Sequence, residues 1–151
     1  MAKKRGFEIV KKFKDAGLDL PQRETANAAG YDIKAAADIT IPADGSIKLV
    51  STGLKAYMQA EEVLYLINRS SGPYKRGLVL PNSVGVIDAD YYNNEKNEGE
   101  IFVQMRSISG QDVQIKKGDR IVQGIFIPFL IADDDQATGV RAGGFGSTGD
   151  K

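Results

Sequence analysis

The sequence predicts an all-β protein, a sandwich or barrel built from many short strands. Three observations lead to this prediction. Apolar and polar residues alternate with a period of two in several short stretches, turn residues separate these stretches at frequent intervals, and helical periodicity is almost absent. The chain has 151 residues, of which 42% are hydrophobic and 26% charged, so one globular domain with an adequate core is expected.

The expected strands follow one another along the chain. They cover residues 7–10, 39–41, 47–50, 54–58, 63–67, 78–80, 100–107, 112–116 and 121–131, the last as one long strand or two. Turn sequences lie between them, among them Pro42-Ala43-Asp44-Gly45 and Lys117-Gly118-Asp119. Residues 11–17 are polar and turn-like, and residues 24–30 are small and flexible. In the segment 100–107, every second residue is apolar, so one face of that strand is expected to be buried.

The stretch from Asn82 to Tyr91 is the centre of the expected organisation. Its β-forming residues suit a strand or a tight hairpin, and Gly85 either relaxes the backbone or allows a close approach. In a continuous strand, Asp88 and Asp90 would point to one face, and Ile87 and Tyr91 to the other. The alternative is a strand end that carries two solvated acids.

Two absences restrict the chemistry. The sequence contains no His and no Cys, which excludes an imidazole base, a thiol nucleophile, disulfides and thiolate-bound zinc. A carboxylate or a lysine remains as a base, and a metal would need oxygen ligands, which favours Mg²⁺. The net charge is zero, from 20 basic and 20 acidic residues, so binding of nucleic acid by bulk electrostatics is not expected.

No membrane segment is expected. The basic residues near Met1 are not followed by an apolar signal core, and the most apolar run, 121–132, is interrupted by Gln123, Gly124 and Pro128. A cytoplasmic location is therefore the expectation. Residues 1–132 are expected to form a single domain, and residues 133–151, rich in acids, Ala, Gly and Thr, a flexible C-terminal arm or a disordered tail.

Residues 69–77 (Arg-Ser-Ser-Gly-Pro-Tyr-Lys-Arg-Gly) indicate a short helix. Ser70 or Ser71 can cap its start, Pro73 suits its first turn, and Gly77 can end it. With Arg69 and the two hydroxyls, such a start can cradle a phosphate. An ordinary capped turn is the alternative.

Residues 141–149 (Arg-Ala-Gly-Gly-Phe-Gly-Ser-Thr-Gly) fit G-x-G-x-x-G formally. A dinucleotide-binding fold is not expected, because no βαβ unit can follow at this position. The segment offers phosphate-binding groups and a ring, Phe145, which could stack on a nucleobase for roughly 1–3 kcal/mol. A disordered tail with a single aromatic residue is the alternative.

Taken in order, five segments of the chain resemble the trimeric deoxyuridine triphosphatase (dUTPase) family. They are residues 29–35 (Ala-Gly-Tyr-Asp-Ile-Lys-Ala), 69–71 (Arg-Ser-Ser), 82–91, 118–123 (Gly-Asp-Arg-Ile-Val-Gln) and 141–149. The resemblance extends from about Gly6 to the end of the chain. It implies a homotrimer of jelly-roll β-barrels that hydrolyses dUTP to dUMP and pyrophosphate with Mg²⁺.

The resemblance also implies roles for individual residues. Asp88 matches the general base that activates the attacking water, Asn82 matches the residue that binds the uracil edge, and Tyr91 matches the ring beneath the deoxyribose. Gly85 and the backbone of Val86, Ile87 and Phe102 line the base site. The implied phosphate contacts are Arg69, Ser70, Ser71, Gly72 and Gln123, and Asp32 matches the carboxylate that holds the metal through water.

In this family the C-terminal arm closes over the active site of a neighbouring subunit. Arg141, Ser147 and Thr148 would then meet the γ-phosphate, while Phe145 and the adjacent Gly146 would cover the uracil. The active sites of the homotrimer would therefore be shared between subunits.

Two features depart from the usual family pattern. Residues 92–98 (Tyr-Asn-Asn-Glu-Lys-Asn-Glu) are inserted before Gly99, and we expect a charged surface tip rather than a lid or a partner-binding loop. Residues 72–74 also differ from the commoner pattern.

Two other functions remain open. A dCTP deaminase resembles this family in its fold and in the Arg-Ser-Ser segment, but it needs a Glu where this chain has Gln104. The other alternative is a regulatory module that binds nucleotide, or a protein partner through the insertion.

Overall fold

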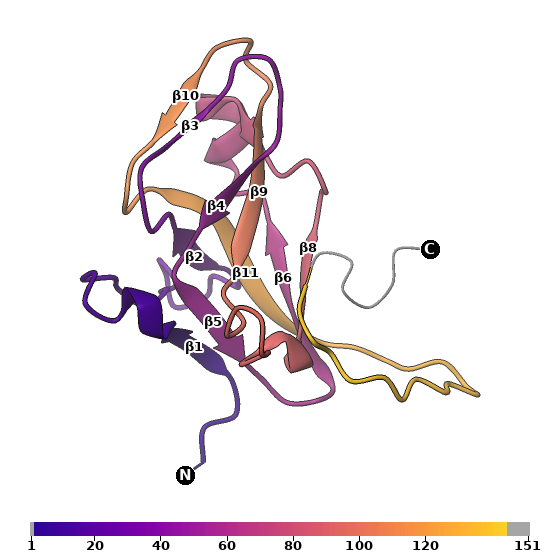
Figure 1. Cartoon of the computed structure of the whole chain (residues 1–151). Helices are drawn as coiled ribbons and strands as arrows, with labels where there is room; N and C mark the ends of the chain where they lie inside the picture. The colour runs from indigo at the N-terminus through magenta and orange to yellow at the C-terminus, as the bar shows by residue number, and fades with distance from the viewer. Residues whose placement is uncertain (1, 145–151) are drawn as a thin grey trace.

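A computed structural model describes residues 2–144 of the chain (Figure 1). Its strands are β1 (Gly6–Ile9), β2 (Tyr31–Lys34), β3 (Ile39–Ile41), β4 (Lys48–Ser51), β5 (Leu54–Tyr57), β6 (Glu62–Ile67), β7 (Leu78–Val79), β8 (Gly85–Asp88), β9 (Phe102–Ser107), β10 (Val113–Ile115) and β11 (Arg120–Pro128). Three single-turn helices lie between strands: η1 (Lys11–Phe13) after β1, η2 (Gly72–Arg76) after β6 and η3 (Ala89–Tyr91) after β8. The expectation of an all-β fold is confirmed.

All strand pairs within these residues are antiparallel. The largest sheet has the order β2-β11-β6-β8, a second has the order β4-β9-β7, and two further pairs are β1-β5 and β10-β3. Neighbours in the sheets are often distant in sequence, as in the register of Val63 of β6 opposite Asp88 of β8. The fold therefore places β8, in the stretch from Asn82 to Tyr91, at the edge of the largest sheet beside β6.

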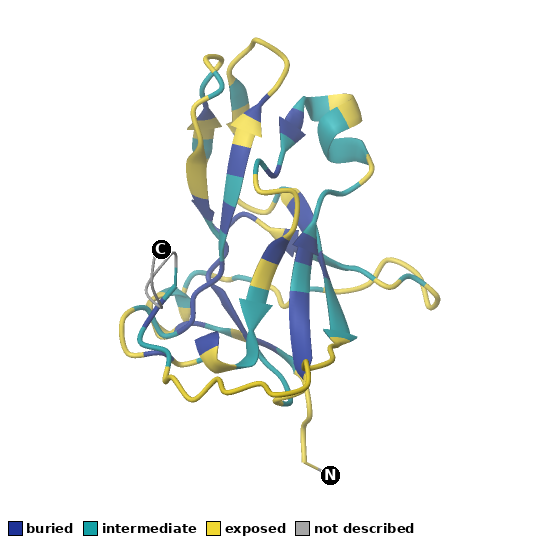
Figure 2. Cartoon of the chain, turned by 90° about the vertical axis from the view of Figure 1, so that its right-hand side faces the viewer, coloured by how far each residue is buried: buried dark blue, intermediate teal, exposed yellow. Residues whose placement is uncertain are grey.

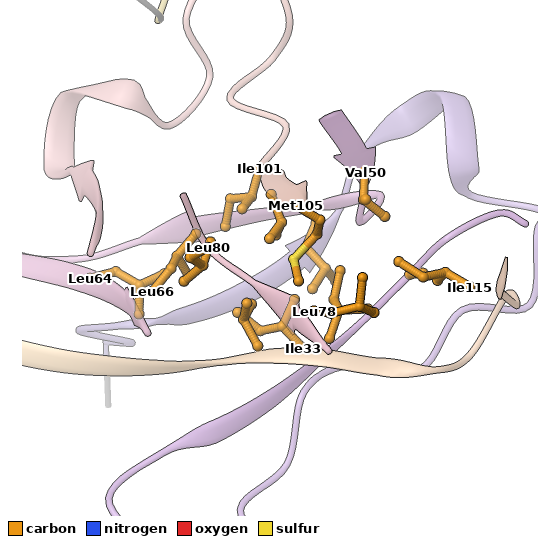
Figure 3. Close-up of a cluster of buried hydrophobic side chains, with 14 of the residues drawn as sticks. Ile33, Val50, Leu64, Leu66, Leu78, Leu80, Ile101, Met105 and Ile115 are labelled. Carbon is orange, nitrogen blue, oxygen red and sulfur yellow. The ribbon is translucent and has the colours of Figure 1, made fainter. Parts of the chain in front are cut away.

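The hydrophobic core lies between the sheets (Figure 3). β9 shows why the chain folds this way, because Val103 and Met105, together with Ile101 just before the strand, are at most 1% exposed. The residues between them face outward or line a cavity, as the period of a strand requires. The core supplies a rigid platform from which β8 and β9 present polar residues.

Most strand boundaries agree with expectation to within one or two residues, and the two larger differences concern β2 and β11. β2 was not expected, because small residues flank it on both sides, at 28–30 and 35–37. The expected strand 121–131 ends at Pro128, and the next three residues, Phe129, Leu130 and Ile131, are exposed (Figure 2). The turns were predicted correctly, with Gly45 and Gly118 at φ values of 81° and 91° that favour glycine.

The segment after β11 leaves the body of the protein and then turns back toward β8 (Figure 1). From residue 129 to residue 144 it forms no helix and no strand. Arg141 to Gly144 are less exposed than the residues before them, because they return to the protein surface. In the part of the chain that is described, no helix has the length and apolar character that crossing a membrane requires.

Candidate active site

A cavity of about 190 Å³ lies beside β8. Its walls come from β6, β8, β9 and the returning C-terminal segment, and its lining residues are Leu66, Leu80, Asn82, Gly85, Val86, Ile87, Asp88, Tyr91, Phe102, Gln104, Arg141 and Gly144. Eight of the predicted site residues are among them: Asn82, Gly85, Val86, Ile87, Asp88, Tyr91, Phe102 and Arg141. The structure thus brings together the residues that the sequence assigned to the base, the sugar and the attacking water.

Gly85 allows the close packing of β8 on β6. It lies opposite Leu66, and a Cβ atom at this position would come within 3.1 Å of the Leu66 Cβ. The turn that precedes the strand is tight, since Ser83 has a φ of 64° and the amide of Val84 donates to the carbonyl of Asn82 over 2.7 Å. This turn leaves the side chain of Asn82 exposed at the cavity.

Asp88 and Asp90 do not lie in one continuous strand. β8 ends at Asp88, and Asp90 belongs to the turn η3, so the stretch is not the continuous strand in which both carboxylates would point to one face. The two carboxylates nevertheless share one partner, because Arg141 binds both. Its Nη2 lies 2.6 Å from Asp88 Oδ2 and its Nε lies 2.7 Å from Asp90 Oδ1.

Tyr91 is held at its hydroxyl by two hydrogen bonds. The hydroxyl donates to the carbonyl of Glu100 over 2.6 Å and accepts from Nδ2 of Asn97 over 2.9 Å. The residue is 6% exposed, and burial raises the pKa of its phenol. The hydroxyl is therefore protonated at neutral pH, and the ring forms a fixed, uncharged wall of the cavity.

Gln104 lines the cavity although the sequence did not place it among the site residues. It lies two residues after Phe102 on β9, so both side chains point to the same face. The alternation of β9 was the signal that could have identified it. Its amide adds a hydrogen-bond donor and an acceptor to this wall.

The predicted phosphate and metal residues form a second cluster. Arg69 Nε donates to Asp32 Oδ1 over 2.9 Å, and its Nη1 donates to the Ser71 hydroxyl over 3.2 Å. Gln123 faces Asp32 across the β11–β2 pair, and its Nε2 donates to the carbonyl of Asn68 over 3.1 Å. These groups present cationic and hydrogen-bonding atoms of the kind that bind phosphate.

The helix next to this cluster is confirmed in position but not in its cap. η2 begins after Ser71, has Pro73 in its first turn and ends at Gly77, which has a φ of 64°. The Ser71 side chain makes no capping hydrogen bond and is bound to Arg69 instead. Ser70 is exposed and Gly72 opens the helix, beside the Arg69 cluster.

Asp88 and Arg69 lie at opposite ends of β6. Asp88 is opposite Val63 near the start of this strand, while Arg69 follows Ile67 at its end. Four residues of a strand span about 13 Å, so Arg69 lies well away from Asp88, and it is not among the residues that line the cavity. Within a single chain, the predicted phosphate contacts therefore lie apart from Asp88, the predicted general base.

Asp32 suits a metal site in which the protein supplies a single carboxylate. Among the residues described, no group of three acidic side chains converges as a complete metal site. Mg²⁺ is commonly held by one or two carboxylates, several waters and the phosphates of a substrate. A single carboxylate beside phosphate-binding groups, as at Asp32, suits that type of binding.

Four predicted residues, Phe145, Gly146, Ser147 and Thr148, lie outside the described residues. Their roles stay predictions, as does the closure of the arm over a neighbouring subunit. In the single chain, Arg141 contacts Asp88 of its own subunit.

Known proteins resemble this chain over most of its length. A sequence model of the dUTPase family matches residues 15–149. The deoxyuridine 5'-triphosphate nucleotidohydrolase of Lactococcus lactis subsp. lactis (strain IL1403) is 60% identical over 147 residues, which cover 96% of this chain and 97% of the relative. The same enzyme from Desulfitobacterium hafniense (strain DSM 10664 / DCB-2) is 39% identical over 143 residues, or 90% of this chain and 91% of the relative.

Solved structures agree with this relationship. The crystal structure of the dUTPase from Streptococcus mutans superposes with a TM-score of 0.80 at 59% identity, covering 85% of this chain and 98% of that one. A mutant dUTPase from phage phi11 of S. aureus, with a structural Mg(II) ion, shares the fold at a TM-score of 0.69 and 19% identity, over 91% of this chain and 98% of that one. From the match to the family's sequence model and from the 60% identical relative, we conclude that the chain belongs to the dUTPase family.

Proposed function

We propose that this protein hydrolyses dUTP to dUMP and pyrophosphate, with a water molecule activated by Asp88 as the attacking group at the α-phosphorus. The observation that carries the proposal is the common cavity of Asp88, Asn82 and Tyr91, which are the residues that the family pattern assigns to the water, the uracil and the sugar. The matches to named dUTPases support the substrate and the type of bond that is broken.

The role of Asp88 follows from its chemistry. Transfer of a phosphoryl or nucleotidyl group needs little covalent assistance and depends mainly on positioning and charge neutralisation. A carboxylate is a weak base near neutral pH, so its main contribution is to orient the water and to accept its proton late in the reaction. Asp88 is half-buried at the cavity, where its carboxylate can face a water once Arg141 has moved from it to the phosphates.

Charge neutralisation is assigned to the second cluster. Arg69, Ser71 and Gln123 would bind the phosphates, and Asp32 would hold Mg²⁺ through water. The ion would neutralise part of the charge on the triphosphate. On nucleotide binding, Arg69 would exchange part of its contact with Asp32 for a phosphate oxygen, since both acceptors suit its guanidinium.

Recognition of the base and the sugar would take place in the cavity. Asn82 and the backbone of β8 offer donors and acceptors to a uracil edge, and a pattern built for uracil rejects cytosine because buried polar groups would be left unpaired. The Tyr91 ring would exclude the 2'-hydroxyl of a ribonucleotide by steric contact, since it is packed in place.

The separation of the two clusters supports a shared active site. A triphosphate bound with its base beside Asn82 and its sugar on Tyr91 needs phosphate contacts within a few ångströms of Asp88, whereas Arg69 lies at the far end of β6. We therefore propose a homotrimer in which the Arg69 cluster of one subunit faces the Asp88 cavity of the next. A cytoplasmic location and a protein partner at the insertion remain predictions.

The direct test is a substrate panel of dUTP, dTTP, UTP and dCTP with purified protein, measured with Mg²⁺ and with excess EDTA. We expect pyrophosphate and dUMP in equal amounts from dUTP, a strong preference over the other three nucleotides, and lower activity in EDTA. Release of ammonia from dCTP would instead identify a deaminase. Nucleotide binding without turnover of any substrate would favour the regulatory module.

A further inference from the structure

The inserted segment, residues 92–98, is partly buried and hydrogen-bonded to the body of the protein, unlike a free surface tip. Its exposed residues include Glu95 and Lys96, as expected, but Asn94 is only 7% exposed. The Asn94 amide donates to the carbonyl of Tyr91 and to Oδ1 of Asn97, both over 2.8 Å, and its own Oδ1 accepts from the backbone amide of Lys96 over 3.0 Å. The segment is therefore folded around a buried, fully bonded asparagine.

The segment is also anchored at its ends. Nζ of Lys55 on β5, a residue that is 7% exposed, lies 2.7 Å from Oε2 of Glu98. Oε1 of Glu98 accepts from the backbone amide of Lys11 over 3.0 Å. The hydroxyl of Tyr92 donates to the carboxylate of Glu8 on β1. These contacts tie the insertion to the β1–β5 pair and limit its movement relative to the body of the protein.

One residue of this anchored segment reaches the cavity wall. Asn97 uses its two amide atoms differently, since Oδ1 accepts from the amide of Gly99 over 3.0 Å while Nδ2 donates to the Tyr91 hydroxyl over 2.9 Å. The same hydroxyl donates to the carbonyl of Glu100, so the ring is held by one donor and one acceptor. A tyrosine without the Asn97 contact would keep only one of these restraints.

We infer that Asn97 is a positioning residue for sugar discrimination: by holding the Tyr91 hydroxyl, it keeps the ring from yielding to the 2'-hydroxyl of a ribonucleotide. This inference rests on the proposed function. Steric exclusion is effective only while the excluding group cannot move, because a shift of the ring by a fraction of an ångström would relieve the overlap. The insertion thus takes part in specificity, and its buried polar network has a reason beyond filling a loop.

The test compares kcat/KM for dUTP and for UTP in Asn97→Ala and Asn97→Asp. The Asp variant keeps an acceptor for Gly99 and Asn94 but has no N–H to donate to Tyr91. The loss of one neutral hydrogen bond corresponds to about a 3- to 10-fold rise in the UTP-to-dUTP ratio of kcat/KM. Glu95→Ala, an exposed position in the same segment, is the matched control and should leave the ratio unchanged.

A double-mutant cycle separates positioning from a general loss of structure. In a Tyr91→Phe background there is no hydroxyl to hold, so Asn97→Ala should change the ratio no further. A readout that does not depend on activity is the NMR chemical shift of the Tyr91 Cζ atom, which should move in Asn97→Asp and stay unchanged in Glu95→Ala.

Several outcomes would overturn the inference. One is a ratio that stays at the wild-type value in both Asn97 variants while the melting temperature falls. Another is an effect of the same size in the Tyr91→Phe background, and a third is an unmoved Tyr91 Cζ shift. A wild-type protein that does not hydrolyse dUTP would instead refute the proposed function, and the Cζ shift would still report whether Asn97 holds Tyr91.

Discussion

The guanidinium of Arg141 binds Asp88, with 2.6 Å between Nη2 and Oδ2, although the two residues are 53 positions apart in the sequence. Arg141 also binds Asp90, so the returning C-terminal segment is attached to the cavity by two acidic side chains. A bound triphosphate would offer the guanidinium a more highly charged partner. The arm is therefore expected to have two binding states, one on the carboxylates and one on the phosphates.

The substitution Arg141→Ala should selectively impair the binding and turnover of the triphosphate. We expect kcat/KM for dUTP to fall by about 10²-fold, since the loss of a hydrogen bond to a charged group typically costs about 1.5–3 kcal/mol. Binding of dUMP, which lacks the outer phosphates, should change little. Calorimetric titration with dUMP and with a non-hydrolysable dUTP analogue measures both, and equal weakening of the two ligands would refute the assigned phosphate contact.

Mixed trimers test whether the active sites are shared. Arg69→Ala and Asp88→Asn should each be nearly inactive alone. After refolding of an equal mixture, about one quarter of the sites in random trimers would combine an intact Arg69 with an intact Asp88 from different subunits. Activity near a quarter of the wild-type value is therefore expected. If both residues act within one chain, the mixture would remain as inactive as the separate variants.

Replacement of Tyr91 by Ala should admit UTP. The ring is the steric barrier in our account, so its removal should raise the kcat/KM for UTP relative to that for dUTP by more than the Asn97 variants do. Steady-state kinetics with both nucleotides measure this ratio. Unchanged discrimination in Tyr91→Ala would show that another group excludes the ribose.

The anchor of the insertion should depend on pH. The hydrogen bond from Lys55 lowers the pKa of Glu98 below its usual value of 4.5. A carboxyl whose pKa is lower in the folded state stabilises the protein above the unfolded-state pKa, and this contribution is lost as the pH falls through the folded-state pKa.

The variant Glu98→Gln measures this contribution. It should reduce the free energy of unfolding by about 1–2 kcal/mol near pH 7, because a hydrogen bond to a charged group is replaced by a neutral one. The difference from the wild type should shrink below about pH 4. Urea unfolding at several pH values provides the comparison, and a difference independent of pH would contradict the ionic contribution of Glu98.

Much of the fold was predictable because its signals are local. The alternation around Val103 and Met105 predicted a strand with one buried face, and Gly118 predicted a turn. β2 was missed because small residues flank it on both sides and obscure its alternation. β11 ends at Pro128, where proline has no amide hydrogen to donate. The apolar run continues beyond Pro128, so the sequence alone did not show where the strand would end.

The site was predictable where one segment supplies it and less so where distant segments meet. Asn82, Asp88 and Tyr91 come from one stretch, and the structure places all three at one cavity. The contacts of Arg141 with Asp88 and of Asn97 with Tyr91 depend on the path of the chain and on the conformation of a loop, neither of which has a sequence period. The separation of Arg69 from Asp88 along β6 likewise becomes visible only when the strand register is known.

The variant Asp88→Asn is the most direct test of whether Asp88 activates the attacking water. Asn keeps the size and part of the hydrogen bonding of Asp but cannot accept the proton. We predict that kcat for dUTP falls by roughly 10²–10⁴-fold, while the affinity for a non-hydrolysable dUTP analogue stays within about threefold of the wild-type value. A variant that binds the analogue and still turns over dUTP at a rate near the wild-type value would contradict the account.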